Sequence, residues 1–518
     1  MKKYMLIAVT AFLMGSCSTR TEDNVTPDPQ QSVELVNKAT RDKIIADNLK
    51  TKGEFEWAWV DNATLFSAIT DGNDGSMTVG YMPEGFKNIN TRMHEIDVKS
   101  SEWVEAKEQL ISDIQAVYKK YGINKTRKEL VLREHDVLPF FKVSVSIVQV
   151  VDLVRNSPKV RYAEPSTYNF TMPGQNNHRI TGSPGCGSET SGTIPSADYF
   201  RASDNALVSW HLEKNRVTQA WGISGKGRNI NLGVIDTGTS PAQPKLGSSF
   251  NGGYSNVGRR IQRYGTFAPS VWFWQKRKID GPNDDCGHGT SMSGVMAAPR
   301  TTDGTPTGVA YESNLYAVRG TDDVMLNSGD EQDGVSDALV LLANKNTHII
   351  SMSLGNLWSV GQIADAVRYA YGKGKMIFSA AGTSFSWANN IVGVIFPATM
   401  SEILAVTGVT DRNGYKECHN CHYGRKVDFV LVMQRDGSSS RTALTLPMSG
   451  NSPDQVGGSS VATATMAGIA ALVWSTNPSQ SRATVLQRLK SSAEFYPNRN
   501  SSFGWGKVDA YKAVASVR

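Results

Sequence analysis

The spacing of the apolar side chains divides the chain into two regions with different predicted architectures. In the first region, Ala106, Leu110, Ile114 and Val117 recur at helical spacing, and Gly122 ends the helix that they predict. Short apolar runs on either side of this helix are typical of strands. The predicted order is strand 94–98, helix 101–121, strands 130–134 and 140–145, helix 147–156 and strand 160–163. This βαββαβ order indicates a small ferredoxin-like α+β unit.

From about residue 207 onward, near-continuous apolar runs alternate with helical patterns at 335–345 and 361–371. Strands that are apolar on both faces occur in parallel sheets with helices on either side. The predicted strands are 231–235, 314–319, 348–353, 376–380, 403–406 and 427–430. We therefore expect a doubly wound, mostly parallel α/β domain, with functional residues at the carboxyl ends of its strands.

The segments around these two units have weaker patterns. Residues 32–85 carry no readable motif, apart from a turn at 73–75 and an alternation at Trp57 and Trp59 that is typical of a short strand. Residues 171–206 are rich in turn-forming residues, which predicts a linker and a suitable place for proteolytic cleavage. The expected organisation is a leader at 1–17, a tether and unassigned segment at 18–85, the small unit at 86–170, the linker at 171–206 and the large domain at 207–518.

Composition narrows the classes of function only slightly. Apolar residues make up 40% and charged residues 20% of the 518 residues, values that are ordinary for globular proteins. A formal charge of +6 over this length gives no reason to expect nucleic acid as a partner.

The first seventeen residues have the pattern of an export signal. Two lysines precede an apolar run at 4–14, which is too short to span a bilayer because about 20 residues are needed. The small residues Gly15 and Ser16 then precede Cys17, an arrangement that resembles a bacterial lipobox. Lipidation of Cys17 would anchor the mature protein to a membrane of the bacterial cell envelope, on its periplasmic side or facing the cell surface. A simple secretory signal is the alternative.

Three short motifs carry candidate chemistry. Asp236 follows the apolar run at 231–235, His288 opens a helix of small residues, and Ser460 shortly follows two glycines at the start of an apolar helix. Each motif alone has an ordinary structural explanation: a strand-end turn, a helix cap, or a tight turn before a buried helix. The Asp-Thr-Gly motif also occurs in aspartic proteases, but these need a second such element, which the sequence lacks.

Together, the three motifs resemble the catalytic residues of the subtilisin superfamily of serine proteases in type, local context and order. Serine is a weak nucleophile at neutral pH and needs a base in hydrogen-bond contact, whose tautomer is fixed by a carboxylate. The resemblance therefore implies that Ser460 is the nucleophile, His288 the general base and acid, and Asp236 the orienting carboxylate.

Further segments resemble the same family in the right order. Residues 351–355 look like the strand that pairs with the substrate backbone, which implies that Ser353, Leu354 and Gly355 bind substrate and line the first specificity pocket. Residues 148–165 resemble the end of a subtilisin propeptide, which in that family folds as a ferredoxin-like unit, assists folding and inhibits the enzyme. Its last strand lies in the substrate cleft until it is cut. The expected function is an exported serine endopeptidase that is made as a zymogen, acts on protein or peptide substrates and has its own propeptide as a partner.

One position departs from the family pattern. After residues 379–382 the family has an asparagine whose amide stabilises the oxyanion, whereas this chain has Thr383. The hydroxyl of Thr383 is one candidate donor, and Asn389 or Asn390 is another. The departure predicts a slow or highly selective protease, and it leaves a pseudoprotease or a peptide-binding module on the same fold as the alternative function. No cofactor is required; calcium is common in the family, but the sequence shows no ligand set for it.

Four cysteines remain after Cys17. Because an exported chain meets an oxidising compartment, the even number favours two disulfides. Cys418 and Cys421 have metal-like spacing, but zinc would need a second pair of ligands, so a disulfide is favoured over zinc or free thiols. A bond at Cys286 would hold its partner beside the catalytic histidine, and Cys186 in the linker is one candidate partner.

Overall fold

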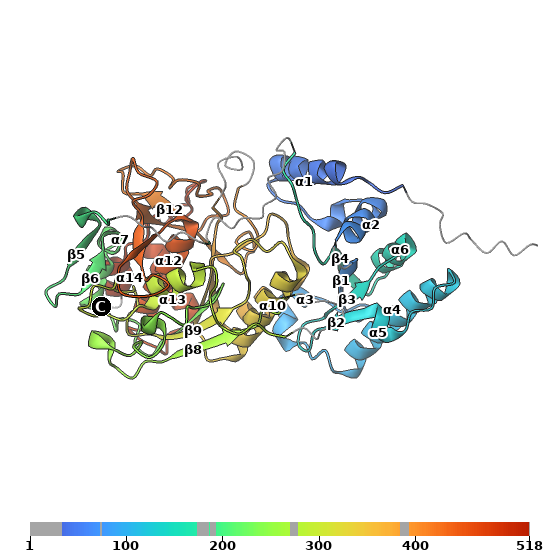
Figure 1. The fold of residues 1–518 in the computed structure, drawn as a ribbon, viewed down its shortest axis with the longest axis horizontal. Coiled ribbons are helices and arrows are strands. Elements are labelled where there is room, and N and C mark those ends of the chain that lie inside the picture. The colour runs from blue at the N-terminus through green and yellow to red at the C-terminus, as the bar shows by residue number, and fades with distance from the viewer. Residues whose placement is uncertain are drawn as a thin grey trace, which may run out of the picture.

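The computed structural model describes residues 34–72, 75–173, 186, 193–269, 278–383 and 393–516. Cys17, the export signal and the candidate donors Asn389 and Asn390 lie outside these residues. Among the described helices, none is both long enough and apolar enough to cross a membrane. Figure 1 shows two units: the elements of the N-terminal third lie together on one side, and the rest of the chain forms the other side.

The larger unit is organised around a seven-stranded sheet with the order β13-β12-β11-β10-β7-β9-β8. All neighbouring strands in this sheet are parallel. The strands are β7 (Asn231–Asp236), β8 (Ile261–Gly265), β9 (Asn314–Arg319), β10 (Ile349–Met352), β11 (Met376–Ala380), β12 (Leu404–Thr410) and β13 (Phe429–Gln434). The six predicted strands match members of this sheet, and β8 is an additional edge strand.

Helices cover both faces of this sheet. Along β7, Leu232 and Val234 belong to the core on the α9 and α12 side, whereas Ile235 belongs to the core on the α10 and α11 side. Burial on both faces explains the near-continuous apolar runs, and the predicted doubly wound α/β fold is confirmed. The four helices are α9 (His288–Ala297), α10 (Gly329–Asn344), α11 (Gly361–Gly372) and α12 (Gly458–Trp474).

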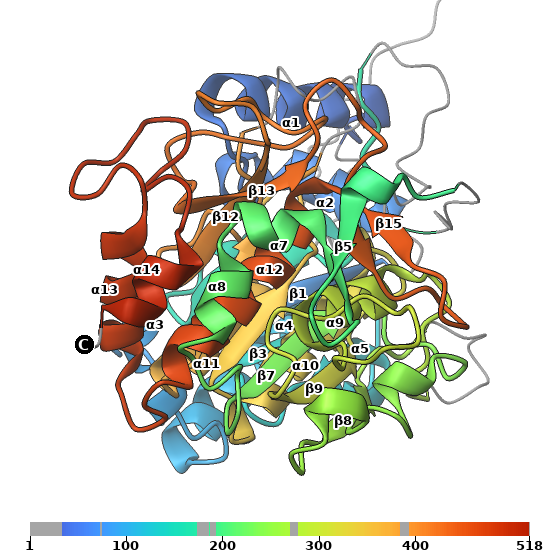
Figure 2. The ribbon, with the colours of Figure 1, turned by 90° about the vertical axis from the view of Figure 1, so that its left-hand side faces the viewer.

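Shorter elements complete the larger unit. Figure 2 shows α12 near its centre, with α8, α13 and α14 on one side, and these helices contact α12 directly. The helices are α7 (Trp210–Lys214), α8 (Val217–Trp221), α13 (Arg482–Ser492) and α14 (Ala510–Ala515). The two-stranded sheets pair β5 (Tyr199–Arg201) with β6 (Leu207–Ser209) and β14 (Ala443–Thr445) with β15 (Asp454–Val456). Short 3₁₀ helices occur at Ser196–Asp198, Pro244–Leu246 and Gly253–Ser255.

The N-terminal unit has a four-stranded antiparallel sheet with the order β2-β3-β1-β4. Its α4 and α6 connect the strands in the expected βαββαβ order and pack against each other. Figure 1 shows this sheet between α4, which belongs to the same unit, and α10, which belongs to the larger unit. The elements are α1 (Lys38–Lys52), α2 (Asn62–Asp71), β1 (Ser76–Tyr81), α3 (Ile89–Arg92), α4 (Ser101–Lys120), α5 (Arg127–Leu130), β2 (Val131–Glu134), β3 (Phe140–Ser144), α6 (Val148–Asn156) and β4 (Val160–Pro165).

The prediction of a strand at 94–98 is wrong. The first strand is instead β1, in the middle of the sheet, and Met93–Glu95 form a 3₁₀ helix. Trp57 also lies in a 3₁₀ helix rather than in a strand, and its ring packs edge-on against Tyr168 and Trp358. The small unit therefore begins before residue 86 and includes α1 and α2 from the unassigned segment.

Buried ion pairs join the two units. Arg161 on β4 contacts Asp365 on α11, and their side chains are 8% and 0% exposed. Nη1 of Arg161 donates to Oδ1 of Asp365 at 2.9 Å, and the hydroxyl of Tyr162 donates to Oδ2 at 3.0 Å. A second buried carboxylate, Asp333 on α10, lies 2.7 Å from Nζ of Lys142 on β3. These two buried carboxylates, Asp333 and Asp365, therefore have their closest cations on the small unit.

We expect Arg161→Ala to destabilise the docked arrangement by about 3–5 kcal/mol, because it leaves the Asp365 carboxylate buried without its closest cation. The measurement is urea unfolding of the full-length chain, followed by the fluorescence of the tryptophans, two of which, Trp57 and Trp358, meet at this interface. The control is Lys43→Ala, which removes an exposed pair with Asp47 and should leave the midpoint unchanged. An unchanged midpoint for Arg161→Ala would contradict the prediction.

Candidate active site

Asp236 and His288 are in direct contact at the carboxyl end of the large sheet. Asp236 is the last residue of β7, and His288 is the first residue of α9. Nδ1 of His288 lies 2.8 Å from Oδ1 of Asp236, and the two side chains are 4% and 1% exposed. Helix α9 approaches the strand end this closely because Gly289 has no side chain: a Cβ there would lie 2.3 Å from the backbone oxygen of Gly238.

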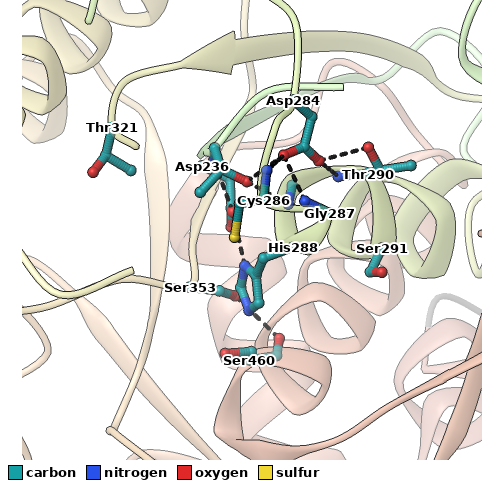
Figure 3. Close-up of polar contacts among 12 residues, drawn as sticks. Asp236, Asp284, Cys286, Gly287, His288, Thr290, Ser291, Thr321, Ser353 and Ser460 are labelled. Carbon is teal, nitrogen blue, oxygen red and sulfur yellow. Dashed lines mark hydrogen bonds and ion pairs between the residues drawn. The ribbon is translucent and has the colours of Figure 1, made fainter. Parts of the chain in front are cut away.

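A buried carboxylate that the sequence did not single out, Asp284, holds the loop before α9. It accepts five hydrogen bonds, from the backbone N–H groups of Cys286, Gly287 and Thr290 and from the hydroxyls of Thr237 and Thr290 (Figure 3). These donors come from both the end of β7 and the start of α9, so Asp284 fixes the two relative to each other. The sequence signal for this role is an acid shortly before a predicted helix start, a pattern typical of Asx turns.

Two opposing effects act on the pKa of His288. Burial lowers the pKa, because the imidazolium loses contact with water, whereas the Asp236 carboxylate raises it through its charge and its hydrogen bond. Asp284 and Asp323 add smaller electrostatic contributions in the raising direction. The net result is a pKa above the ordinary value of 6.5. The Asp236 carboxylate therefore favours the imidazolium, the form that a general base reaches when it accepts a proton.

Ser460 lies beside His288. It occupies the first turn of α12, and Figure 3 shows His288 between Asp236 and Ser460. The hydroxyl of Ser353 donates to the backbone oxygen of Ser460 at 3.1 Å, which fixes this turn.

The cavity in front of Ser460 has a volume of about 250 Å³. Its lining includes His288 together with Ser353, Leu354 and Gly355, so the residues expected to bind substrate share one cavity with the expected base and nucleophile. No Asp, Glu, Lys or Arg lies among the described residues that line it. The described residues from 34 to 173 do not line it either, so the part of the small unit that the structure describes leaves this cavity open.

Both backbone groups of Gly355 are already hydrogen-bonded within the chain. Its N–H donates to the oxygen of Val324 at 3.0 Å, and its carbonyl accepts from the N–H of Leu326 at 2.9 Å. The side-chain amide of Asn356 donates to the oxygen of Leu326 at 2.7 Å and holds this segment in place. An extended substrate can therefore pair with the backbone of Gly355 only if residues 324–326 move away from it. The pairing with substrate stays a prediction.

The turn before Ser460 is packed against Thr383. Gly458 has a φ of +79°, and a Cβ at this position would lie 2.7 Å from Oγ1 of Thr383. Thr383 lines the same cavity as Ser460, and its Oγ1 accepts a hydrogen bond from the N–H of Ser459 at 3.0 Å. Thr383 therefore lies beside the turn that carries Ser460 and faces the same cavity, and its role as an oxyanion donor stays a prediction.

Both pairs of cysteines are joined as disulfides. Cys186 is bonded to Cys286, which ties the linker to the loop just before His288. Cys418 is bonded to Cys421, so the structure has the disulfide at this position rather than a zinc site or free thiols. Within the described ranges, no three His, Cys, Asp or Glu side chains are placed to share a metal ion.

The comparisons with known proteins agree with this geometry. The sequence profile of the subtilase family matches residues 227–506, which include Asp236, His288 and Ser460. The minor extracellular protease Epr of Bacillus subtilis is 27% identical over 413 residues, a match that covers 78% of this chain and 54% of the relative, so the chain spans about half of that protein. Thermitase of Thermoactinomyces vulgaris is 28% identical over 303 residues, which cover 58% of this chain and 94% of thermitase.

A solved structure has the same overall fold. Fervidolysin from Fervidobacterium pennivorans, a keratinolytic enzyme related to subtilisin, superposes with a TM-score of 0.56 at 16% identity. The superposition covers 85% of this chain, more than residues 207–518 alone could supply, and 60% of fervidolysin. At this identity the likeness shows the fold alone. The family profile, which matches more than half of the 518 residues, shows the membership: the chain belongs to the subtilase family of serine peptidases.

Proposed function

We propose that this protein is an exported serine endopeptidase that hydrolyses peptide bonds through an acyl-enzyme on Ser460. The observation that carries the proposal is the buried contact of Asp236 with His288, which lines one cavity together with Ser460. The described lining has no side chain with a fixed charge, so it offers nothing to anchor the charged terminus of a substrate. This favours cleavage within a polypeptide over removal of terminal residues, and protein or peptide as the substrate class.

The geometry supports the following sequence of steps. Nδ1–H of His288 donates to Asp236, which leaves Nε2 free to take the hydroxyl proton of Ser460. The serine oxygen attacks the peptide carbonyl, and His288 then returns the proton to the leaving amine. Water, activated by the same imidazole, hydrolyses the ester and regenerates Ser460. Asp236 stabilises the imidazolium that forms in each half of the reaction.

We further propose that the chain is a zymogen whose N-terminal unit is an inhibitory propeptide. The buried pairs between Arg161 and Asp365 and between Lys142 and Asp333 support a docked position of this unit on α10 and α11. The inhibitory role is proposed from the resemblance of residues 148–165 to a subtilisin propeptide. Export and lipidation at Cys17, with anchoring to a membrane of the bacterial cell envelope, are proposed from the signal pattern alone. No cofactor and no nucleic acid take part in this proposal.

A fluorophosphonate probe tests the proposed function, because it reacts covalently with an activated serine. We expect the folded protein, after an incubation that allows processing, to be labelled at Ser460, as located by peptide mass spectrometry. Heat-denatured protein is the control and should stay unlabelled, since the activation requires His288 and Asp236 in place. A folded and processed protein that takes up no label would favour the pseudoprotease or peptide-binding alternative.

A further inference from the structure

A second serine, Ser459, stands directly before the nucleophile, and its side chain is fully buried. The backbone N–H of Gly382 donates to Oγ of Ser459 at 3.2 Å. The same Oγ lies 3.0 Å from Oγ1 of Thr383, and the N–H of Ser459 donates to that Oγ1 at 3.0 Å. Three hydrogen bonds therefore join Ser459 to Gly382 and Thr383.

The direction of the bond between the two hydroxyls follows from a count of donors and acceptors. Ser459 Oγ carries one proton, and in the part of the chain that the structure describes its one acceptor is Oγ1 of Thr383. If the proton pointed elsewhere, a buried donor would stay unsatisfied, which is the unfavourable arrangement. Ser459 is therefore the donor, and Oγ1 of Thr383 accepts two hydrogen bonds, both from Ser459.

Among the described residues, the Thr383 proton has no other acceptor, so it remains available to the cavity. Thr383 is only half-buried and lines this cavity together with Ser460. A hydroxyl that accepts two hydrogen bonds is polarised and becomes a better donor. Its backbone is also held in place, since Thr383 forms a β-bridge with Cys421 and the neighbouring Gly382 oxygen accepts from the N–H of His422 at 2.9 Å.

We infer that Ser459 is a positioning residue that aims the hydroxyl proton of Thr383 into the cavity, where it donates to the oxyanion formed when Ser460 attacks a peptide carbonyl. This rests on the proposed peptidase function. The second donor is the backbone N–H of Ser460, because N–H groups in the first turn of a helix have no intrahelical acceptor. The hydroxyls of Thr383 and Ser459 thus replace the single asparagine amide that the subtilisin family has at position 383.

The test compares kcat and KM for Thr383→Val, Thr383→Ser, Ser459→Ala and the double variant Thr383→Val with Ser459→Ala, on one fluorogenic peptide. Thr383→Val keeps the shape and removes the donor, so kcat should fall by about 10²–10³-fold with KM almost unchanged, the loss that removal of an oxyanion donor causes in subtilisin. Thr383→Ser keeps the hydroxyl and should restore most of this loss. Ser459→Ala should lower kcat by about 5-fold, the equivalent of one neutral hydrogen bond.

The double variant distinguishes an indirect role of Ser459 from a separate one. If Ser459 acts only through Thr383, the double variant should be no slower than Thr383→Val alone. Losses that multiply would overturn the positioning role. An active wild type whose Thr383→Val variant is equally fast would overturn the donor role, whereas a wild type without any turnover would contradict the proposed peptidase function instead.

A second measurement keeps the test decisive if Thr383→Val does not fold. A peptide aldehyde forms a tetrahedral adduct with the serine and carries the oxyanion, so its inhibition reports on the donors. Ser459→Ala should weaken aldehyde inhibition by the factor by which it lowers kcat, and it should leave inhibition by the corresponding peptide alcohol unchanged. Equal effects on both inhibitors would show a general disturbance of the cavity and would overturn the inference.

Discussion

Replacing Ser460 by alanine should lower kcat by about 10⁶-fold, the loss that the equivalent change causes in subtilisin. Without the hydroxyl no acyl-enzyme forms, and the remaining turnover comes from direct attack of water on the bound peptide. The turn itself should persist, because Ser353 bonds to the backbone oxygen of Ser460 rather than to its side chain. Hydrolysis of a fluorogenic peptide measures the loss, and fluorescence anisotropy should show that a peptide still binds.

The same variant tests whether the chain processes itself. With Ser460→Ala, the small unit should stay joined to the rest of the chain, as shown by N-terminal sequencing and intact mass. Ser459→Ala is the matched control: it removes the neighbouring hydroxyl but leaves the nucleophile, so processing should be slower yet reach completion. Normal processing of Ser460→Ala would show that another protease performs the maturation.

Asp236→Asn should lower kcat by about 10⁴-fold, because an amide neither fixes the required tautomer of His288 nor stabilises the imidazolium. It should also move the pH dependence. In the wild type, kcat/KM should rise with pH as His288 loses its proton, through a pKa above 6.5. In the variant, burial still lowers this pKa while the raising effect of the carboxylate is gone, so the acidic limb should shift to lower pH.

The measurement is a profile of kcat/KM from mildly acidic to mildly alkaline pH. Asp285→Asn is the matched control, since Asp285 belongs to the same loop but its side chain is 74% exposed and contacts Arg319. It should leave both the rate and the acidic limb in place. An Asp236→Asn profile whose limb stays at the wild-type pH would mean that Asp236 does not set the protonation of His288.

The large unit could be predicted from the sequence because its strands are apolar on both faces. Every position of β7 is buried, and the acid that follows this pattern, Asp236, falls at the strand's carboxyl end. The roles of His288 and Ser460 are predicted from the resemblance of the three motifs to the subtilisin family, because a start of a helix of small residues has an ordinary structural explanation when it stands alone. Local sequence and tertiary packing agree at these three positions.

In the small unit, the central strand β1 could not be predicted from the pattern of apolar residues. β1 has the sequence Ser-Met-Thr-Val-Gly-Tyr, and all six positions are buried because the strand pairs with β3 and β4 and lies in the middle of the sheet. Its burial comes from neighbours distant in sequence, so neither an alternating nor an apolar pattern marks it. Residues 94–98 alternate between polar and apolar side chains as a strand would, but they pair with no strand in the described part of the chain and do not form one.

The hydrogen bonds of Ser459 could not be predicted for the same reason. Thr383 and Ser459 are separated by 76 positions, and the turn at Gly458 brings them together. The sequence shows that the usual amide is replaced by a hydroxyl, but only the fold shows which buried group directs it. The same holds for Asp284, whose five donors are gathered by the end of β7 and the start of α9.

Because Cys186 is bonded to Cys286, the position of a maturation cut would determine whether the small unit stays attached to the rest of the protein. In the proposed zymogen, a cut on the N-terminal side of Cys186 would free the small unit, and its inhibition would weaken as the released unit is diluted. A cut between the two cysteines leaves the small unit attached through sulfur to the loop before His288. Its effective concentration at the active site then stays fixed however dilute the protein becomes. In that zymogen, the side of Cys186 on which the chain is cut would decide whether activation depends on dilution or on a thiol reductant.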